Sequence, residues 1–232
     1  VYIMPVFGGM LADRILGSRK AVTFGAILLV LGHTGMAFES SLQIFYLSLA
    51  LIISGVGFLK PNISTMVGAL YADGDPRRDP GFTIFYMGIN IGAFTATLLC
   101  GYLGEEIGWS YGFGAAGIGM LIGLMIFIWG QDYLEGHAEP SSNFYLEKKY
   151  GISYENWAYI SGLFMVICSW FLIQNQELVG NLLGGFGAIC IAFWLGYSLL
   201  KCSPEERDRL IVVGILIPVS YTHLTLPTKW IV

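Results

Sequence analysis

The chain has 232 residues, of which 55% are hydrophobic and only 12% are charged, and its formal net charge is −4. Soluble domains carry about 25% charged residues, so this composition excludes an ordinary soluble globular protein. The small net charge gives no reason to expect a nucleic-acid partner. Glycine is abundant, at 31 residues, which suits closely packed membrane helices. We therefore expect an all-α, polytopic membrane protein surrounded by the lipid bilayer.

Apolar runs divide the chain into candidate membrane spans, because a spanning helix needs about 20 mostly apolar residues. The connections are short, except for a polar loop at 131–156 whose segment SSNFYLEKKYG is expected to be partly helical or mobile. Seven or eight spans are expected, in this order: Val1–Ala12 (partial), Ala21–Phe38, Leu42–Tyr71, Phe82–Leu103, Tyr111–Gly130, Trp157–Ile173, Leu178–Leu200 and a start at Leu210–Pro218.

The basic residues of the connections support this division. They follow the first, third, fifth and seventh spans, in four groups: Arg14, Arg19 and Lys20; Arg77 and Arg78; Lys148 and Lys149; Lys201, Arg207 and Arg209. If each span crosses the membrane once, all four groups fall on one side, which is the positive-inside pattern. A wrong number of spans would break this alternation. The pattern predicts that the basic loops are cytoplasmic.

The stretch SGVGFLKPNISTMVGALY places a charge, Lys60, and a helix breaker, Pro61, inside the third span. A charge at the centre of a membrane helix costs about 2.5–3.5 kcal/mol, so such a residue should face a cavity or a partner. The alternative is a helix that ends near Leu59, with Lys60 reaching to the interface. Because residues 61–72 carry no charge, we favour a functional Lys60 within the membrane. Pro61 also leaves the carbonyl of Gly57 without a donor, which predicts a bend that exposes polar backbone to a cavity.

A second polar group lies in the fourth span, in FYMGINIGAFTAT. Helical spacing puts Tyr86, Asn90 and either Phe94 or Thr97 on one face. The amide of Asn90 can both donate and accept a hydrogen bond, and so could bind a polar ligand. An interhelical hydrogen bond, worth about 0.6 kcal/mol, is the competing interpretation.

The third motif, GGMLADRILGSRK, joins the first two spans. Its glycines allow close packing, Gly17 permits a tight turn, and the basic cluster that includes Arg19 anchors the cytoplasmic face. Asp13, beside Arg14, could meet the N-terminus of a neighbouring helix or an arginine. A merely solvated loop is the alternative, but the ordered spacing argues against it.

Three weaker features, a histidine, a glycosylation sequon and pairs of small residues, each have a functional and a structural interpretation. His33, inside the second span, could relay protons, but its helix offers no acidic partner. Asn62 begins a glycosylation sequon, but it lies within a span and is discounted. Small residues at four-residue spacing would allow close helix crossings, although glycine is common in membrane helices anyway; the pairs are Gly88–Gly92, Gly92–Ala96 and Gly119–Gly123.

The sequence shows few residues that could form a catalytic or metal-binding site. No acidic residue lies within an expected span, and no glycine loop precedes a soluble helix. The four cysteines, Cys100, Cys168, Cys190 and Cys202, lack metal-ligand spacing. We therefore expect no enzymatic activity, no bound metal and no cofactor.

The motifs resemble those of a known family. GGMLADRILGSRK resembles the loop between the second and third helices of the major facilitator superfamily. GFLKPNIST and FTIFYMGINIGAF resemble two hallmark motifs of the proton-dependent oligopeptide transporters. The second match rests on Phe82, Phe85, Tyr86, Asn90, Gly92 and Ala93.

This resemblance implies the organisation of the chain. Residues 1–130 would form helices two to six, most of the N-terminal transporter bundle. The cytoplasmic loop 131–156 would follow, then an extra helix pair between the two halves at 157–200 and the start of helix seven at 201–219. The family's first-helix Glu-x-x-Glu-Arg motif, its seventh-helix glutamate and its C-terminal half have no counterpart here. We expect residues 220–232 to be a non-native tail and the chain to be a fragment that does not transport by itself.

The resemblance also implies a function, the uptake of di- and tripeptides across the inner membrane of a prokaryote by alternating access, with protons as the coupling ion. Lys60 would serve proton coupling and peptide binding, Asn90 would contact the peptide backbone, and Tyr2 and Tyr86 would line the pocket. Asp13, Arg14, Gly17 and Arg19 would belong to the loop that steadies the conformational switch. Transport of another solute, such as nitrate, and a non-transporting membrane sensor remain alternatives.

Overall fold

The computed structural model describes most of the chain. The described residues are 3–38, 41–72, 74–134, 136–140, 146, 148–149, 151–203, 205–210, 212–214 and 216. Tyr2 and the expected tail at 220–232 lie outside them. The chain divides into two units, Val1–Gln174 and Asn175–Val232, which are described separately.

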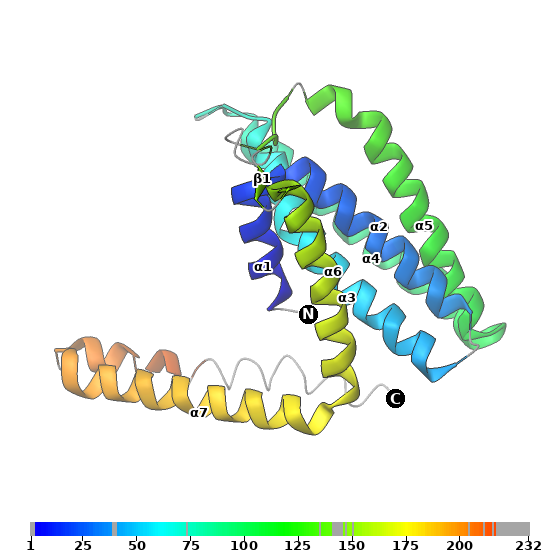
Figure 1. The fold of residues 1–232 in the computed structure, drawn as a ribbon. Coiled ribbons are helices and arrows are strands. Elements are labelled where there is room, and N and C mark those ends of the chain that lie inside the picture. Colours follow the sequence, from blue (N-terminus) through cyan, green and yellow to red (C-terminus); the bar gives the residue numbers. More distant parts are fainter. Residues whose placement is uncertain are drawn as a thin grey trace. The chain divides into compact units, whose positions relative to one another are not determined.

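Helices dominate both units, as the composition predicts (Figure 1). Six described helical runs are long and apolar enough to cross a membrane. The first run, Met4–Ala37, contains both of the first two expected spans. In chain order the elements are α1 (Met4–Leu11), the π-helix η1 (Ala12–Leu16), α2 (Gly17–Ala37), α3 (Leu42–Ala69), α4 (Arg78–Glu106), α5 (Trp109–Trp129), the 3-10 helix η2 (Gly130–Leu134), β1 (Lys148–Lys149), β2 (Ile152–Ser153), α6 (Tyr154–Gln174) and α7 (Gln176–Lys201).

The first run turns back on itself at Gly17. Gly17 has φ +74°, a conformation that glycine adopts readily and other residues rarely do. A Cβ added to Gly8 would collide with the carbonyl of Gly57, and one added to Gly25 would lie 2.7 Å from the carbonyl of Gly55. In a straight helix Gly8 and Gly25 would be about 25 Å apart, yet both meet neighbouring residues of α3. Therefore α1 and α2 run in opposite directions, as the two separate spans predict.

Helix α3 lies at the centre of the first unit, with α1, α2 and α6 packed against it. It begins after Ser41, whose Oγ accepts a hydrogen bond from the backbone N–H of Ile44 at 3.3 Å, an N-cap that satisfies one exposed donor. The α6 contact is aromatic. The ring of Phe24 meets that of Phe58 edge-on at 5.1 Å, and Gly162 leaves room for both rings. This contact holds α6 against α2 and α3.

The close helix crossings differ from those expected from spacing. A Cβ added to Gly88, Gly92, Gly119 or Gly123 would meet nothing within 4 Å. The expected crossings at these glycines are therefore wrong for the described residues. Crossings instead occur where the glycines face another helix, as at Gly8 with Gly57. Spacing within one helix cannot reveal which face a neighbour will cover.

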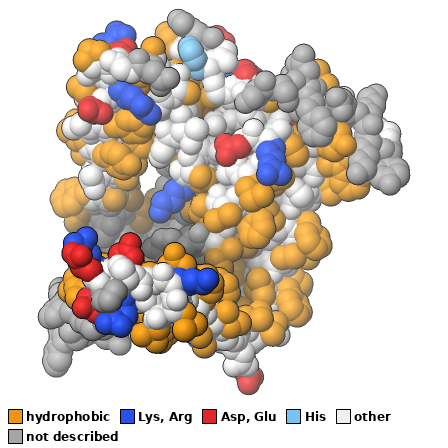
Figure 2. All heavy atoms as spheres, turned by 90° about the vertical axis from the view of Figure 1, so that its left-hand side faces the viewer, with side chains coloured by type: hydrophobic (Ala, Val, Ile, Leu, Met, Phe, Trp, Pro, Cys, Tyr) orange, Lys and Arg blue, Asp and Glu red, His pale blue; other side chains and the backbone are white. Residues whose placement is uncertain are grey.

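Helix α4 is the least covered helix of the first unit. It packs mainly against α5 and contacts α3 less, and Gly104 is its one buried residue among those described. Its apolar side chains, such as Ile91 and Phe94, are 58% and 68% exposed. Hydrophobic side chains also cover much of the face in Figure 2, and charged ones are sparse. Such a surface suits lipid or further protein rather than water.

The loop after α5 contains a small hairpin. Strands β1 and β2 pair antiparallel, with Lys148 opposite Ser153 and Lys149 opposite Ile152. Gly151, in the two-residue turn, has φ +82°, which suits a tight hairpin turn. The stretch was expected to be partly helical or mobile: Leu146 has 3-10 geometry, residues 148–149 form a strand, and residues 141–145 lie outside the described part of the chain.

The second unit contains α7 and the helical residues that follow it. Ser203 and Glu206 form a capping box, in which the Glu206 carboxylate accepts from the Ser203 backbone N–H at 3.0 Å. This hydrogen bond lowers the pKa of Glu206. Helical residues are described from Glu205 onward, within the range 201–219 that was expected for the start of helix seven. The signal S-x-x-E was present in the sequence.

Candidate functional site

Lys60 lies in the interior of an unbroken helix. α3 continues through Lys60 and Pro61 to Ala69, so the alternative of a helix that ends near Leu59 is wrong. Nine residues separate Lys60 from the helix end, or about 14 Å along the axis. Its side chain is exposed, whereas Gly57 and Phe58, on another face of the same helix, are buried. The ammonium thus lies deep along the helix, on a face that the bundle leaves open.

The residues next to Lys60 join α3 to α1. Asn62 is only 1% exposed, and its Nδ2 donates to the carbonyl of Phe58 at 2.7 Å and to that of Gly8 at 3.4 Å. The carbonyl of Gly57, which Pro61 deprives of its helix donor, packs against Gly8. The expected opening of this backbone to a cavity is therefore wrong. The contact instead fixes the part of α3 that carries Lys60.

Asn90 and Tyr86 lie on α4, the uncovered helix. Both are exposed, and Asn90 Nδ2 donates to the backbone carbonyl of Tyr86 at 2.8 Å. The ring of Tyr86 stacks against that of Phe82 at 6.4 Å. Residues 82, 86 and 90 thus form one stripe along the helix, as the spacing predicts. No interhelical hydrogen bond of Asn90 is found among the described residues.

Lys60 and Asn90 lie at similar depths. A Cβ on Gly68 of α3 would lie 3.5 Å from the ring of Phe82 in α4, so these helices meet near their basic ends. Lys60 precedes Gly68 by eight residues, and Asn90 follows Phe82 by eight. Each therefore lies about 12 Å from this contact along its own helix.

The loop motif divides into an exposed part and a packed part. Asp13 and Arg14, on the π-helix η1, are exposed, and Asp13 forms no hydrogen bond or ion pair within the described ranges. Gly17 is buried, and a Cβ on it would lie 2.7 Å from the backbone N of Pro140. The tight turn expected at Gly17 is thus present and is covered by the loop after α5.

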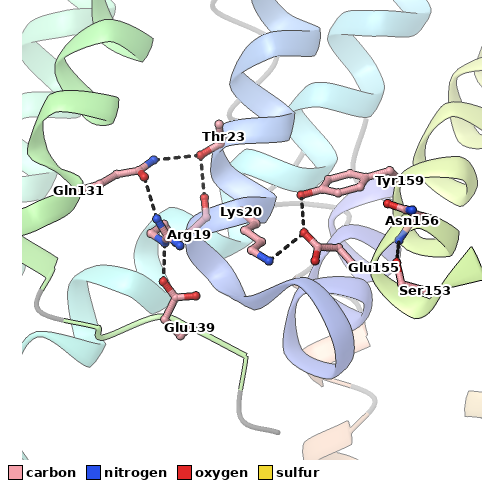
Figure 3. Close-up of polar contacts among 9 residues, drawn as sticks. All are labelled: Arg19, Lys20, Thr23, Gln131, Glu139, Ser153, Glu155, Asn156 and Tyr159. Atoms are coloured by element: carbon pink, nitrogen blue, oxygen red, sulfur yellow. Dashed lines mark hydrogen bonds and ion pairs between the residues drawn. The ribbon is translucent and has the colours of Figure 1, made fainter. Parts of the chain in front are cut away.

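Arg19 connects three segments (Figure 3). Its Nη1 donates to Oε1 of Gln131 at 2.8 Å, and its Nε lies 2.6 Å from Oε1 of Glu139 in an ion pair that lacks the angle of a hydrogen bond. The backbone N–H of Arg19 donates to the carbonyl of Ala138. Gln131 also donates to Oγ1 of Thr23 at 3.3 Å. The turn between α1 and α2 is thereby tied to the end of α5.

Lys20 makes a second connection, to α6. Its Nζ donates to Oε1 of Glu155 at 2.8 Å, and both side chains are less than a quarter exposed. The hydroxyl of Tyr159 donates to the same carboxylate oxygen at 3.4 Å. The sequence predicted a basic anchor here but not its carboxylate partners, Glu139 and Glu155. Their position in the loop 131–156, on the side of the basic groups, was the available signal.

Two further polar residues have local partners. His33 Nδ1–H donates to the carbonyl of Leu29 in its own helix at 2.8 Å, a structural contact. In the loop before α4, Arg77 lies against the carboxylate of Asp75 at 2.8 Å. The hydrogen bonds from Arg77 lower the pKa of Asp75 to about 2 and raise that of Arg77.

These features define a class of protein before any comparison. Long apolar helices, basic loops between them and few charges within them are those of a multi-pass membrane protein. Comparison with known proteins identifies the family: the model of the POT family, PTR2, matches residues 19–171. The chain belongs to this family, as the motifs predicted.

Similar relatives include bacterial transporters. An uncharacterized transporter, YclF, from Bacillus subtilis is 37% identical over 99% of this chain and 41% of its own length. The peptide transporter YePEPT of Yersinia enterocolitica is 35% identical over 94% of this chain and 45% of its own. A di-/tripeptide transporter from Lactococcus lactis is 43% identical over 61% of this chain and 29% of its own. The chain thus spans less than half the length of these relatives.

Solved structures support the same assignment. A peptide transporter POT in complex with alafosfalin matches 98% of this chain and 47% of its own, with a TM-score of 0.72 and 34% identity. A POT family transporter in complex with a thioalcohol-conjugated peptide matches 90% and 44%, with a TM-score of 0.64 and 28% identity. The described helices are therefore part of the major facilitator fold that these transporters share.

Proposed function

We propose that the chain forms part of a transporter that takes up di- and tripeptides through the cytoplasmic membrane of a prokaryote, driven by protons. Membership of the POT family supports this proposal, as do the peptide transporters among the relatives. The observation that carries it is the common depth of Lys60 and Asn90 on open faces of α3 and α4. The ammonium of Lys60 is complementary to the carboxylate terminus of a short peptide, and the amide of Asn90 can form hydrogen bonds with the peptide backbone.

Lys60 would bind the carboxylate of the peptide. An ammonium held within the membrane is stabilised by an opposite charge, either a carboxylate of the protein or that of the substrate. Protonation of the protein's carboxylate weakens its pair with Lys60 and so favours the peptide in its place. Proton and peptide binding would thus be coupled through one ammonium, with protons as the coupling ion and neither metal nor cofactor required.

Asn90 and Tyr86 would contact the peptide itself. With its Nδ2 held by the carbonyl of Tyr86, Asn90 presents Oδ1 as an acceptor for a peptide N–H. The stacked ring of Tyr86 would form an apolar wall beside it. Tyr2, expected to line the same pocket, lies outside the described residues.

The loop motif would steady the switch between conformations. Gly17 and Arg19 are fixed to the loop after α5 by packing and by an ion pair, whereas Asp13 and Arg14 remain exposed. The two halves of such transporters rock about a central site. We propose that Asp13 and Arg14 engage the opposite half in one conformation and release it in the other.

A chimera tests the substrate class. The matching segment of the Yersinia peptide transporter would be replaced by residues 3–216 of this chain, and uptake of a labelled dipeptide would be measured in proteoliposomes with an inward proton gradient. We expect uptake that unlabelled di- and tripeptides compete away and that nitrate leaves unchanged. Competition by nitrate but not by peptides would overturn the proposed substrate. No uptake of any solute by a correctly folded chimera would favour the sensor.

A further inference from the structure

A cavity of about 290 Å³ lies beside the first turns of α2, at the cytoplasmic end of the first unit. One wall follows α2 itself. Gln131, from η2, and Tyr159, from α6, contribute the other walls. Three separate helical segments therefore enclose this space, and neither Lys60 nor Asn90 belongs to it.

The α2 wall changes from charged to apolar with depth. Lys20, Thr23, Phe24 and Ile27 follow one another at helical spacing along one face. Lys20 and Ile27 are about 10 Å apart along the axis. Ile27 is 42% exposed, so the apolar end is open to the bilayer. From the charged end inward, the wall therefore offers an ammonium, a hydroxyl, an aromatic ring and an alkyl chain. A phospholipid has groups that match these in the same order, namely a phosphate, an ester and an acyl chain.

The two cations of the cavity wall, Arg19 and Lys20, are both paired with carboxylates. Arg19 and Lys20 line the cavity, but their partners Glu139 and Glu155 do not. A guanidinium has five N–H donors, and the contacts of Arg19 with Glu139 and Gln131 engage its Nε and Nη1. Donors of Arg19 are thus left for a further acceptor. Basic pockets between membrane helices on the cytoplasmic side are known to bind anionic head groups.

We propose that this cavity binds an anionic phospholipid. Its phosphate lies against Arg19 and Lys20, its ester groups lie near Thr23 and Gln131, and one acyl chain follows Phe24 and Ile27 into the membrane. Inorganic phosphate shares the head-group chemistry but makes no use of the apolar end. The lipid would hold α2, η2 and α6 together, whatever solute the protein transports.

Native mass spectrometry of the full chain in detergent tests the proposal. We expect retention of phosphatidylglycerol in preference to phosphatidylcholine of the same chain length. Because each basic residue contributes about 1 kcal/mol to such binding, the double variant Arg19→Gln/Lys20→Gln should bind phosphatidylglycerol about 30-fold more weakly. Arg77→Gln/Arg78→Gln, which removes the same charge from another cytoplasmic loop, should bind it as the wild type does.

A second variant keeps the test valid if the double variant Arg19→Gln/Lys20→Gln fails to fold. Ile27→Trp fills the apolar end and leaves both ion pairs in place, so it should weaken phosphatidylglycerol binding severalfold. Inorganic phosphate at the same concentration should leave the lipid bound. Equal binding of phosphatidylglycerol by the wild type and both variants, no preference over phosphatidylcholine, or full displacement by inorganic phosphate would each overturn the proposal.

Discussion

At Gly8 the backbone of α1 comes so close to α3 that no side chain fits between the helices. A Cβ there would collide with the carbonyl of Gly57, the group that Pro61 leaves without its helix donor. The Asn62 amide donates to the carbonyls of Gly8 and Phe58 on either side. These few residues thus join α1 to α3 beside the proline and fix the position of Lys60.

Gly8→Ala should therefore destabilise the protein by about 1–3 kcal/mol, the usual cost of overpacking. The matched control is Gly119→Ala, where a Cβ meets nothing within 4 Å and alanine favours the helix by up to about 1 kcal/mol. Unfolding of both variants in one detergent, followed by circular dichroism, would measure the difference. Equal stability of the two variants would contradict the packing described at Gly8.

Asp75, in the loop before α4, provides a test of one charged contact. Its pKa is lowered from 3.8 to about 2, mainly by the Arg77 side-chain hydrogen bond. A lowered carboxyl pKa stabilises the folded loop above the ordinary pKa, and this contribution is lost as the pH falls towards 2. Arg77→Gln should raise the Asp75 midpoint, followed by carboxyl NMR, part of the way to its ordinary value, because the backbone N–H of residue 77 still donates to Asp75; Arg78→Gln should not raise it. An unchanged midpoint in Arg77→Gln would show that another group lowers the pKa.

Between elements, charge pairs join helices that are distant in sequence. Lys20 at the start of α2 meets Glu155 at the start of α6, and Arg19 meets Glu139. Aromatic packing of Phe24 against Phe58 and Tyr159 continues the α6 contact at greater depth. The ion pairs thus fix the ends of α2 and α6, whose apolar faces pack against each other and against α3.

Breaking the Lys20–Glu155 pair should loosen the start of α6. Glu155→Gln should speed hydrogen exchange in residues 154–160, while Glu106→Gln, at an exposed carboxylate, should not. In a double-mutant cycle with Lys20→Gln, we expect a coupling energy of about 1 kcal/mol, the upper end for partly exposed pairs. Additive effects of the two substitutions would mean that α6 is held by apolar packing alone.

At the scale of the whole molecule, the sequence predicted what depends on composition and local order. Apolar length and basic loops identified the spans to within a few residues, because the bilayer fixes both. The stripe of Tyr86 and Asn90 followed from helical spacing. The sequence did not reveal that Gly88 and Gly119 face open space, or that Glu139 and Glu155 pair with the basic loop. Those features depend on which helix faces pack against each other, and the spacing of residues within one helix does not determine that packing.

In the proposed function, Lys60 couples proton movement to peptide uptake. Lys60→Ala in the chimera with the Yersinia transporter tests this role, with Arg78→Ala as a control for loss of a positive charge elsewhere. The measurement is uptake of a labelled dipeptide into proteoliposomes under an inward proton gradient. We predict that Lys60→Ala abolishes gradient-driven uptake, whereas Arg78→Ala retains it. Uptake by Lys60→Ala that rises with the gradient as in the parent chimera would contradict the account.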